Sequence, residues 1–531
     1  MMKSRYSSRT VIQICLALFF ALVVIAPIVT MFTRINSDSI NEIIHGPKFG
    51  KAVINSITTA LTATVISMVL AIGASFSVCR TSMRGKGIFA MLFVLPMLIP
   101  SISHAYGLKA LIGVNGSGML AFILGGNVSI YGFWGIVAGS VMYSFPVAFL
   151  MIQSILQYED GMPYKAAIVL GIPPLRRFTG ITLPYMRKTL ISMFFAVFTM
   201  IMTDYGVPAA LKNEAFGDTL STIMFSDATQ LKLGNAGVIG IMLLIPAIIA
   251  FAVDMLVPET SQSGFVSETV ETGKSKLPKI AAYIFCSVLV IAILMPISAF
   301  IVQVFAKAYP RDMSFSLAHI QKTFKSGADG YLKNSLIYSA VAAIFGTLLA
   351  FISAYMTSRA KSKITKALHL MSITSVAIPG LVLGLSYIIF FKNTPIYGTI
   401  LIIGLANSIH FFASPYLMMY NTLGKVNPDL EAVGKTLGIS RIRIITSVIV
   451  PKVRFTMYEM AVYFFVNSMM TISAVSLLAP PAPQPLSLMI SSAESQIDIG
   501  KAATVSLMIL IINFIIKFVI TLINRKRAKD R

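Results

Sequence analysis

Few side chains in this sequence have the type and spacing that catalysis, redox chemistry or metal binding requires. The histidines and cysteines within apolar stretches stand singly, without paired or metal-like spacing: His104, His369, His410, Cys15, Cys79 and Cys286. A metal site needs several ligands at short, regular intervals, and isolated cysteines in apolar surroundings behave as small buried side chains. We therefore expect no catalytic group and no metal site in this chain.

Two short stretches resemble the end of a phosphate-binding loop but lack its beginning. Gly273-Lys-Ser and Gly434-Lys-Thr would each need another glycine five residues earlier, where Glu268 and Asp429 stand. Without that glycine the backbone cannot wrap around the phosphates. We expect this chain to bind no nucleotide.

Two other stretches, in each of which a glycine and a proline stand thirteen residues apart, are the best candidates for partner contact. Residues 164–184 read YKAAIVLGIPPLRRFTGITLP, and residues 431–451 read EAVGKTLGISRIRIITSVIVP. Each predicts a short helix that begins near a proline and ends at a glycine suited to the left-handed position. Small residues would let a partner approach the helix backbone closely. The candidate contact residues are Lys165, Ala166, Ala167, Gly171, Pro184, Glu431, Ala432, Gly434, Gly438 and Pro451.

A third candidate site lies where two apolar stretches end, at residues 203–208 (TDYGVP) and from residue 471 (TISAV). Glycine and proline at these points imply broken helix ends, whose unpaired backbone groups can contact a solute. The alternative interpretation is a capped helix end with a structural aspartate. The candidate solute-path residues are Asp204, Tyr205, Gly206, Pro208 and Ser473.

The composition places these motifs in a membrane protein. Of 531 residues, 56% are hydrophobic and 12% are charged, which is too apolar for a soluble domain of this size. A span needs about 20 apolar residues, and twelve stretches qualify. They are 11–33, 52–78, 88–112, 130–157, 188–210, 235–256, 280–305, 333–357, 367–391, 398–421, 456–479 and 500–523.

The net charge of +23 reflects orientation rather than nucleic-acid binding. Lysine and arginine gather in the segments on the side of the N-terminus, including residues 80–86, 359–366 and 525–531. This is the positive-inside bias, and contact with anionic lipid accounts for the clusters. We expect both termini in the cytoplasm and no nucleic-acid partner.

The chain contains an internal duplication. Residues 55–80 (NSITTALTATVISMVLAIGASFSVCR) and 334–359 (NSLIYSAVAAIFGTLLAFISAYMTSR) share length and pattern, and Pro100 and Pro379 follow at the same separation. A unit of six spans inserts both copies in the same orientation. We predict an all-α polytopic membrane protein with two parallel six-helix repeats, 1–257 and 280–531, joined by a cytoplasmic linker, 258–279.

The two glycine-to-proline stretches resemble the coupling-loop signature of binding-protein-dependent ABC importer permeases. That resemblance implies the type I importer fold and a separate ATPase dimer that binds ATP and Mg²⁺ on the cytoplasmic side. It also implies an extracytoplasmic solute-binding protein and a place in the inner membrane. The signature's acidic position is Lys165 in the first copy and Ala432 in the second, with Glu431 one residue earlier, so we expect asymmetric docking.

Residues 203–208 and 471–475 also resemble the fused permeases of ferric-iron and 2-aminoethylphosphonate importers, and are more similar to the phosphonate group. The resemblance implies 2-aminoethylphosphonate or a related phosphonate as solute, with ferric iron, or another small solute such as thiamine, as the alternative. An ion-coupled secondary transporter is a distant alternative, since it would need carboxylates at mid-bilayer. A membrane-embedded enzyme would need clustered catalytic groups.

Overall fold

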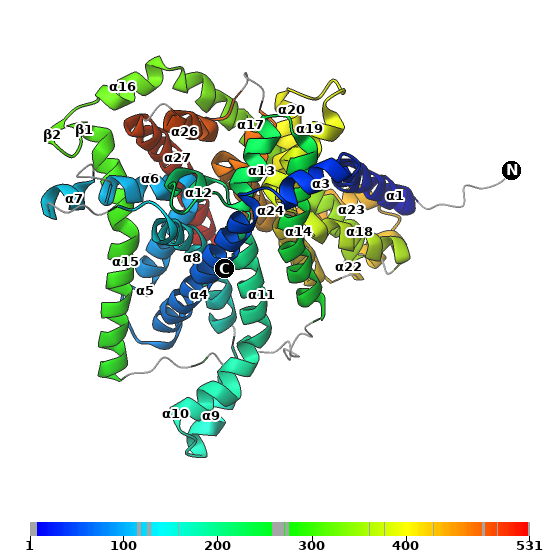
Figure 1. Cartoon of the computed structure of the whole chain (residues 1–531). Coiled ribbons are helices and arrows are strands. Elements are labelled where there is room, and N and C mark those ends of the chain that lie inside the picture. Colours follow the sequence, from blue (N-terminus) through cyan, green and yellow to red (C-terminus); the bar gives the residue numbers. More distant parts are fainter. Residues whose placement is uncertain are drawn as a thin grey trace.

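The computed structural model describes residues 8–113, 118–124, 129–157, 159–256, 270, 275–359, 362–375, 378–427, 429–479, 484–495 and 498–528. These residues are almost entirely helical (Figure 1). The predicted all-α fold class is confirmed. One two-stranded antiparallel hairpin, β1 (Ala306–Ala308) with β2 (Asp312–Phe315), is the exception within this part of the chain.

The helices of the first half are α1 (Ser8–Phe20), π-helix η1 (Ala21–Ile25), α2 (Ala26–Phe32), α3 (Ser37–Ile44), α4 (Phe49–Arg80), α5 (Lys86–Val94), 3₁₀-helix η2 (Leu95–Leu98), α6 (Ser101–Leu111), α7 (Met119–Leu124), α8 (Phe133–Gln157), α9 (Met162–Val169), α10 (Pro174–Arg177), π-helix η3 (Phe178–Thr182), α11 (Leu183–Met202), α12 (Gly206–Leu211), α13 (Leu220–Thr229) and α14 (Leu233–Leu256).

The helices of the second half are α15 (Lys276–Phe305), α16 (Ala318–Lys325), α17 (Ala328–Ser358), α18 (Lys363–Thr374), α19 (Gly380–Phe391), α20 (Ile400–His410), α21 (Ala413–Gly424), α22 (Asp429–Thr436), α23 (Arg441–Ile444), π-helix η5 (Ile445–Ile449), α24 (Val450–Met470), α25 (Ser473–Ser476), α26 (Leu486–Ser495) and α27 (Ile499–Ala528).

Eight helices in the described residues are long and apolar enough to cross a membrane. Two further pairs pass the same test together but are bent, α5–η2 with α6 by 104° and α20 with α21 by 56°. The predicted spans 88–112 and 398–421 correspond to these two bent pairs. In the first of them the residue before Pro100 takes the extended conformation that a following proline favours.

The other two predicted spans coincide with interrupted or more polar helices. Span 367–391 corresponds to α18 and α19, and span 456–479 to α24 and α25. Because α19 has only 12 residues and α24 carries Lys452, Arg454 and Glu459, neither passes the length and hydropathy test. Twelve spans stay a prediction.

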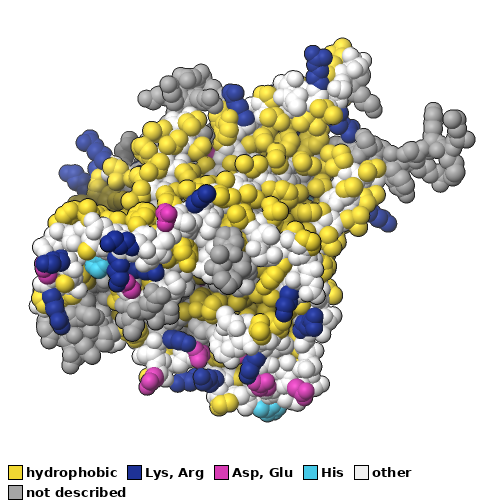
Figure 2. Space-filling view, turned by 90° about the horizontal axis from the view of Figure 1, so that it is seen from above, with side chains coloured by type: hydrophobic (Ala, Val, Ile, Leu, Met, Phe, Trp, Pro, Cys, Tyr) yellow, Lys and Arg dark blue, Asp and Glu magenta, His cyan; other side chains and the backbone are white. Residues whose placement is uncertain are grey.

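A face of small residues lets α4 pack closely in the first half. Ala60, Ala63, Ala71 and Ala74 are fully buried along it, as is usual where membrane helices approach closely. Hydroxyl groups add links to α8, with Ser67 Oγ 2.8 Å from Ser144 Oγ. The remaining side of α4 is apolar and exposed. Figure 2 shows how broad the hydrophobic surface of the molecule is, with charged side chains gathered in separate patches.

The first spans of the two halves are exchanged. Figure 1 shows α15 beside α4 to α6, whereas α1 lies beside α18, at the other side of the molecule. Phe20 on α1 packs against Phe412 with ring centroids 5.0 Å apart, in a core shared with Tyr338. Reciprocally, Phe285 of α15 covers Gly73 of α4. Each half therefore completes its core with a helix from the other.

The repeat boundaries 1–257 and 280–531 stay a prediction. A helix of each predicted repeat packs into the core of the other repeat, so the packing does not separate the chain at these residues. The predicted linker, 258–279, lies outside the described residues at 258–269 and 271–274. Its last residues, from Lys276, are the first turn of α15.

The contact between α6 and α15 yields a stability prediction. A methyl group at Gly107 would stand 2.8 Å from the Pro296 carbonyl oxygen, so Gly107→Ala should destabilise the protein by about 1–3 kcal/mol despite alanine's better helix propensity. Gly50→Ala on α4 is the matched control, because nothing lies within 4 Å of the added methyl. Thermal unfolding in detergent measures both. Equal unfolding temperatures would contradict the exchanged packing.

Candidate functional site

The two glycine-to-proline stretches adopt the same backbone. We call residues 162–184 loop segment 1 and residues 429–451 loop segment 2. The short helices α9 and α22 both end at a glycine in the left-handed conformation, with φ of 67° at Gly171 and 71° at Gly438. In each case the amide of the residue after the glycine donates a hydrogen bond back to the helix. The pairs are Ile172 N to Ala167 O and Ile439 N to Gly434 O, both at 2.9 Å. The predicted glycine-terminated helices are confirmed.

The equivalence continues to the proline. In loop segment 1 a single turn, α10, and the π-helix η3 lead into α11, whose second residue is Pro184. Loop segment 2 repeats this order with α23, η5 and α24, whose second residue is Pro451. The amide before each proline still donates into the π-helix, Leu183 N to Phe178 O and Val450 N to Ile445 O, and the proline itself has no amide hydrogen to donate. Each loop segment is thus continuous with a long helix.

Loop segments 1 and 2 expose apolar side chains. The largest exposed fractions are Val169 87%, Leu170 75%, Leu175 74%, Leu437 69% and Ile442 75%. Such side chains at helical turns need a partner surface or lipid to cover them. Of the predicted contact residues, Lys165, Ala166 and Ala432 are exposed, as this role requires. Ala167 and Gly434 are buried, and Gly434 lies against Ile444 of α23.

Glu431 is half-buried and turned toward its own chain. Its Oε1 atom lies 3.0 Å from Nε of Arg359, and its Oε2 accepts a hydrogen bond of 2.9 Å from the Tyr355 hydroxyl. In the first half, Glu159 is held in a similar way by Arg80 and Tyr164. Burial raises the pKa of the Glu159 carboxyl, while Arg80 and Tyr164 act to lower it.

Sequence reasoning did not select Arg80, Arg359 or Glu159. A signal was present for the arginines, because both copies of the duplicated stretch end in arginine. No sequence signal marked Glu159, which has no acidic counterpart at the matching place in the second half. Only the fold brings it to Arg80.

Four of the five predicted solute-path residues, 204–206 and 208, lie at the far end of α11 from loop segment 1. Since α11 has 20 residues, about 30 Å separates them. Asp204 is 9% exposed, and its Oδ2 accepts a hydrogen bond from Val207 N at 2.9 Å. The aspartate therefore caps α12, as the alternative interpretation supposed. Its backbone carbonyl accepts a bond from Ser221 Oγ at 2.7 Å.

The remaining solute-path candidates gather at two helix crossings. Gly206 and Pro208 are buried on α12, and the Tyr205 ring packs on Phe225 with centroids 4.2 Å apart. In the second half α25 begins at Ser473. The Thr471 carbonyl there accepts a bond from Ser487 Oγ at 2.8 Å, which matches the contact at Asp204. The structure brings Asp204, Tyr205, Gly206 and Pro208 together and places Ser473 in the equivalent break.

At these two crossings serine and glycine exchange places. In the first half the first residue of α6, Ser101, meets the first residue of α12, Gly206, whose added Cβ would lie 2.6 Å from the serine Oγ. In the second half the first residue of α19 is Gly380, and its added Cβ would lie 2.5 Å from Oγ of Ser473 on α25. Each crossing therefore holds the side chain of one serine, and the facing residue is glycine.

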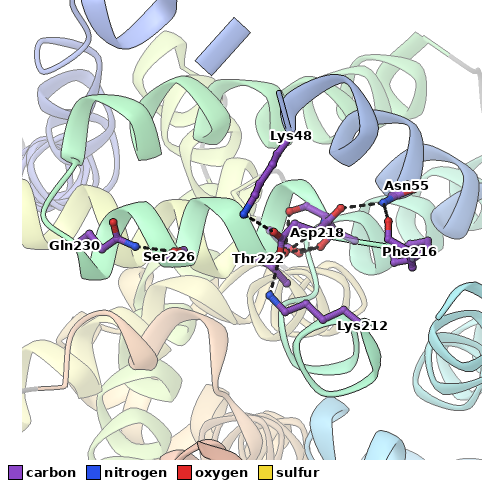
Figure 3. Close-up of polar contacts among 10 residues, drawn as sticks. Lys48, Asn55, Lys212, Phe216, Asp218, Thr222, Ser226 and Gln230 are labelled. Atoms are coloured by element: carbon purple, nitrogen blue, oxygen red, sulfur yellow. Dashed lines mark hydrogen bonds and ion pairs between the residues drawn. The ribbon is translucent and has the colours of Figure 1, made fainter. Parts of the chain in front are cut away.

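The segments beyond the breaks are fixed to α4 and α17. The Asp218 carboxylate forms ion pairs with Lys212 Nζ at 2.7 Å and Lys48 Nζ at 3.9 Å (Figure 3). In the same view, Asn55 of α4 donates a hydrogen bond of 2.6 Å to the Phe216 carbonyl. Asn334, which matches Asn55 in the duplicated stretch, makes the equivalent bond in the second half. It donates to the Gln484 carbonyl at 3.1 Å.

A neighbouring serine repeats the pattern. Ser56 Oγ accepts from Leu220 N at 2.8 Å, and Ser335 Oγ accepts from Leu486 N at 2.6 Å. Among the described residues no group of three or more His, Cys, Asp or Glu side chains could hold a metal ion.

The left-handed glycine of loop segment 2 yields a prediction on local stability. Gly438→Ala places a side chain at φ 71° with nothing within 4 Å, so strain alone acts, at about 1–2 kcal/mol. Hydrogen exchange of residues 429–441 should accelerate roughly fivefold to thirtyfold. Gly438→Asn should accelerate it less, because asparagine tolerates this conformation. Gly424→Ala, which meets neither strain nor contact, should leave exchange unchanged; acceleration there too would disprove the assignment.

The exchanged crossings yield a second prediction. Gly206→Ser should destabilise the protein by about 1–3 kcal/mol through overpacking against Ser101 Oγ and the Ile102 backbone nitrogen. Ser101→Gly in the same chain removes only the first of these contacts and should recover part of the loss. Gly330→Ser, which meets nothing within 4 Å, is the control. The measurement is the thermal unfolding temperature of each variant in detergent. A double variant no more stable than Gly206→Ser would show that the two positions do not share one space.

Two relatives of known name match most of the chain, and a third matches part of it. A putative ferric transport system permease protein of Haemophilus influenzae, FbpB 1, is 23% identical over 88% of this chain and 77% of its own length. The ferric transport system permease protein FbpB of Actinobacillus pleuropneumoniae is 25% identical over 79% of this chain, which spans 62% of that relative. A thiamine transport system permease protein, ThiP, of Brucella abortus is 26% identical over 33% of this chain and 32% of its own length.

The family model described as "Binding-protein-dependent transport system inner membrane component" matches the chain twice, over residues 82–315 and 334–529. Each match contains one loop segment and one broken crossing, but the first leaves out α4 and includes α15. Together they cover more than half of the chain. The chain belongs to the binding-protein-dependent transport system inner membrane components and carries two fused copies of their domain.

Proposed function

We propose that this chain is the permease of an ATP-driven importer, in which loop segments 1 and 2 receive a separate ATPase dimer. The supporting observation is that both loop segments share one backbone, expose apolar side chains, and continue directly into α11 and α24. A partner that moves α9 and α22 would move these long helices with them. ATP and Mg²⁺ bind the ATPase, and this chain performs no hydrolysis.

The topology belongs to the same proposal. The chain crosses the inner membrane several times, with both termini and the loop segments in the cytoplasm. The support is the basic character of the sequence on that side, including Arg176, Arg177, Arg441 and Arg443 next to the two short helices. A solute-binding protein docks on the opposite face.

The solute path in this proposal runs between the broken crossings. Two alternating conformations open it to one side at a time, and ATP binding shifts the population between them. The breaks are suitable gates because α12 and α25 are short, and each follows a backbone carbonyl that is bound by a serine side chain, Asp204 by Ser221 and Thr471 by Ser487. A small shift there changes access without unfolding a full span.

Ferric iron is the solute that we infer. The two relatives that match most of the chain bear names of ferric transport, which favours the alternative over 2-aminoethylphosphonate, the first expectation from the sequence.

Reconstituted transport tests this proposal. Proteoliposomes containing this chain, its ATPase and a ferric-loaded binding protein should accumulate radioactive iron only when ATP is present. Deletion of residues 431–438 should abolish accumulation while the chain still inserts, because the ATPase loses one of its two docking helices. Uptake of 2-aminoethylphosphonate in place of iron would overturn the solute. Undiminished uptake by the deletion variant would overturn the role of loop segment 2.

A further inference from the structure

An arginine, a carboxylate and a tyrosine meet beside each loop segment. In the second half, the Arg359 side chain is 5% exposed and lies 3.0 Å from Oε1 of Glu431, which belongs to α22. Tyr355, on α17, donates to the other carboxylate oxygen at 2.9 Å. Glu431 is therefore bound at the end of α17 by a hydrogen bond from Tyr355 and by a close charge contact with Arg359, in which Nε and Oε1 make no hydrogen bond. We call this group the second latch.

The first half contains the same three groups. Arg80, the last residue of α4, forms an ion pair with Oε2 of Glu159, and the two side chains are 16% and 3% exposed. Tyr164, on α9, donates to Oε1 of Glu159 at 2.9 Å. The Arg80 guanidinium also lies over the Tyr164 ring, 5.8 Å from its centroid. These residues form the first latch.

The two latches contain the same three side-chain types, but the tyrosine and the carboxylate stand at different positions of the duplicated sequence. Arg80 and Arg359 match in the duplicated stretch, but Tyr164 stands where the second copy has Glu431. The tyrosine of the second latch, Tyr355, matches Phe76. Since the tyrosine and carboxylate have moved and the three groups still meet, their meeting is not a mere consequence of the duplicated backbone.

Each latch lies at one end of a long helix, α4 in the first half and α17 in the second. We call these two helices the rods. From Asn55 to Arg80, α4 runs 25 residues, about 38 Å, and its far end holds the segment beyond the first crossing through Asn55 and Ser56. In the second half α17 carries Arg359 just beyond one end and holds the segment beyond α25 through Asn334 and Ser335. A hydrogen-bonded connection thus runs from each loop helix to each crossing.

We propose that Arg80 and Arg359 are positioning residues that lock α9 and α22 to the rods α4 and α17, so that ATPase movement reaches the crossings along these rods. The inference rests on the proposed function. It assigns Glu431 to an internal contact rather than to an ion pair with the ATPase. A buried carboxylate that loses its arginine is left uncompensated, so the connection fails when either partner is removed.

The connection along α11 and α24 alone would be less rigid. Each of those helices begins with a π-helical turn, η3 or η5, where the regular α-helical hydrogen-bond ladder is interrupted. A latch bypasses this turn by fixing the loop helix to a second, uninterrupted α-helix. Loss of the latch should therefore leave docking intact and weaken the transmission of movement.

The test compares transport with ATP hydrolysis in the reconstituted full complex. For Arg359→Gln, the iron taken up per ATP hydrolysed should fall about tenfold, while the ATPase still co-purifies and its hydrolysis rate stays within about twofold. Arg80→Gln should act in the same direction. The matched control is Arg84→Gln, which removes the same charge from an exposed side chain four residues after Arg80. It should leave uptake per ATP unchanged.

Exchange of the two charges separates a latch from a docking contact. The double variant Arg359→Glu, Glu431→Arg should recover at least part of the uptake per ATP that either single variant loses. Should Arg359→Gln fail to fold, Tyr355→Phe keeps the ion pair and should lower uptake per ATP by a smaller factor. Loss of the ATPase from Glu431→Gln with no recovery in the exchanged variant would overturn the latch and support docking.

Measurements on the wild-type complex separate a failure of the proposed function from a failure of the latch proposal. Absence of ATP-dependent iron uptake by the wild-type complex would contradict the proposed function. A wild-type complex that transports, together with latch variants whose uptake per ATP is normal, would leave the proposed function standing and overturn the latch.

Discussion

Backbone amides and carbonyls cannot be left unpaired inside a bilayer, and most of this structure follows from that constraint. Long helices satisfy it along their length. It becomes acute where a helix breaks, and there the chain supplies side-chain partners. Asp204 binds the Val207 amide, and Ser221 and Ser487 bind the carbonyls of Asp204 and Thr471. The breaks that we assign to the solute path can exist because these few polar groups compensate them.

Duplication fixed the backbone more strictly than the side chains. Gly171 and Gly438 hold the same left-handed conformation, which glycine adopts with less strain than residues that carry a Cβ atom. At the helix crossings and in the latches, by contrast, side chains were exchanged between partners. A contact depends on the sum of two side chains, so Ser with Gly fills a crossing in either order. An ion pair with a hydroxyl donor likewise tolerates a change of position provided that all three groups still meet.

The exchanged first spans bind the halves into one body. Because α1 and α15 each complete the core of the other half, neither half has a full core by itself. In the transport cycle that we propose, movement at one crossing would be transmitted to a neighbour that shares its packing, so that the two halves would open and close together.

Much of the fold was already determined by the sequence. Apolar stretches of about 20 residues specify membrane helices because of the bilayer's thickness. Gly171, Gly438, Pro184 and Pro451 specify the loop segments, because each acts on the local backbone. The duplicated stretch ending in Arg80 and Arg359 showed that the two halves are alike.

The tertiary structure alone decided which side chains meet. The bend at Pro100, the exchanged spans, the serine and glycine crossings and the pairing of Glu159 with Arg80 join residues that are far apart in the chain, and no local pattern records such contacts. Glu431 illustrates the difference. From the sequence it was a charge suited to a partner, whereas in the fold Tyr355 donates a hydrogen bond to it and Arg359 lies 3.0 Å away, because α17 ends beside α22.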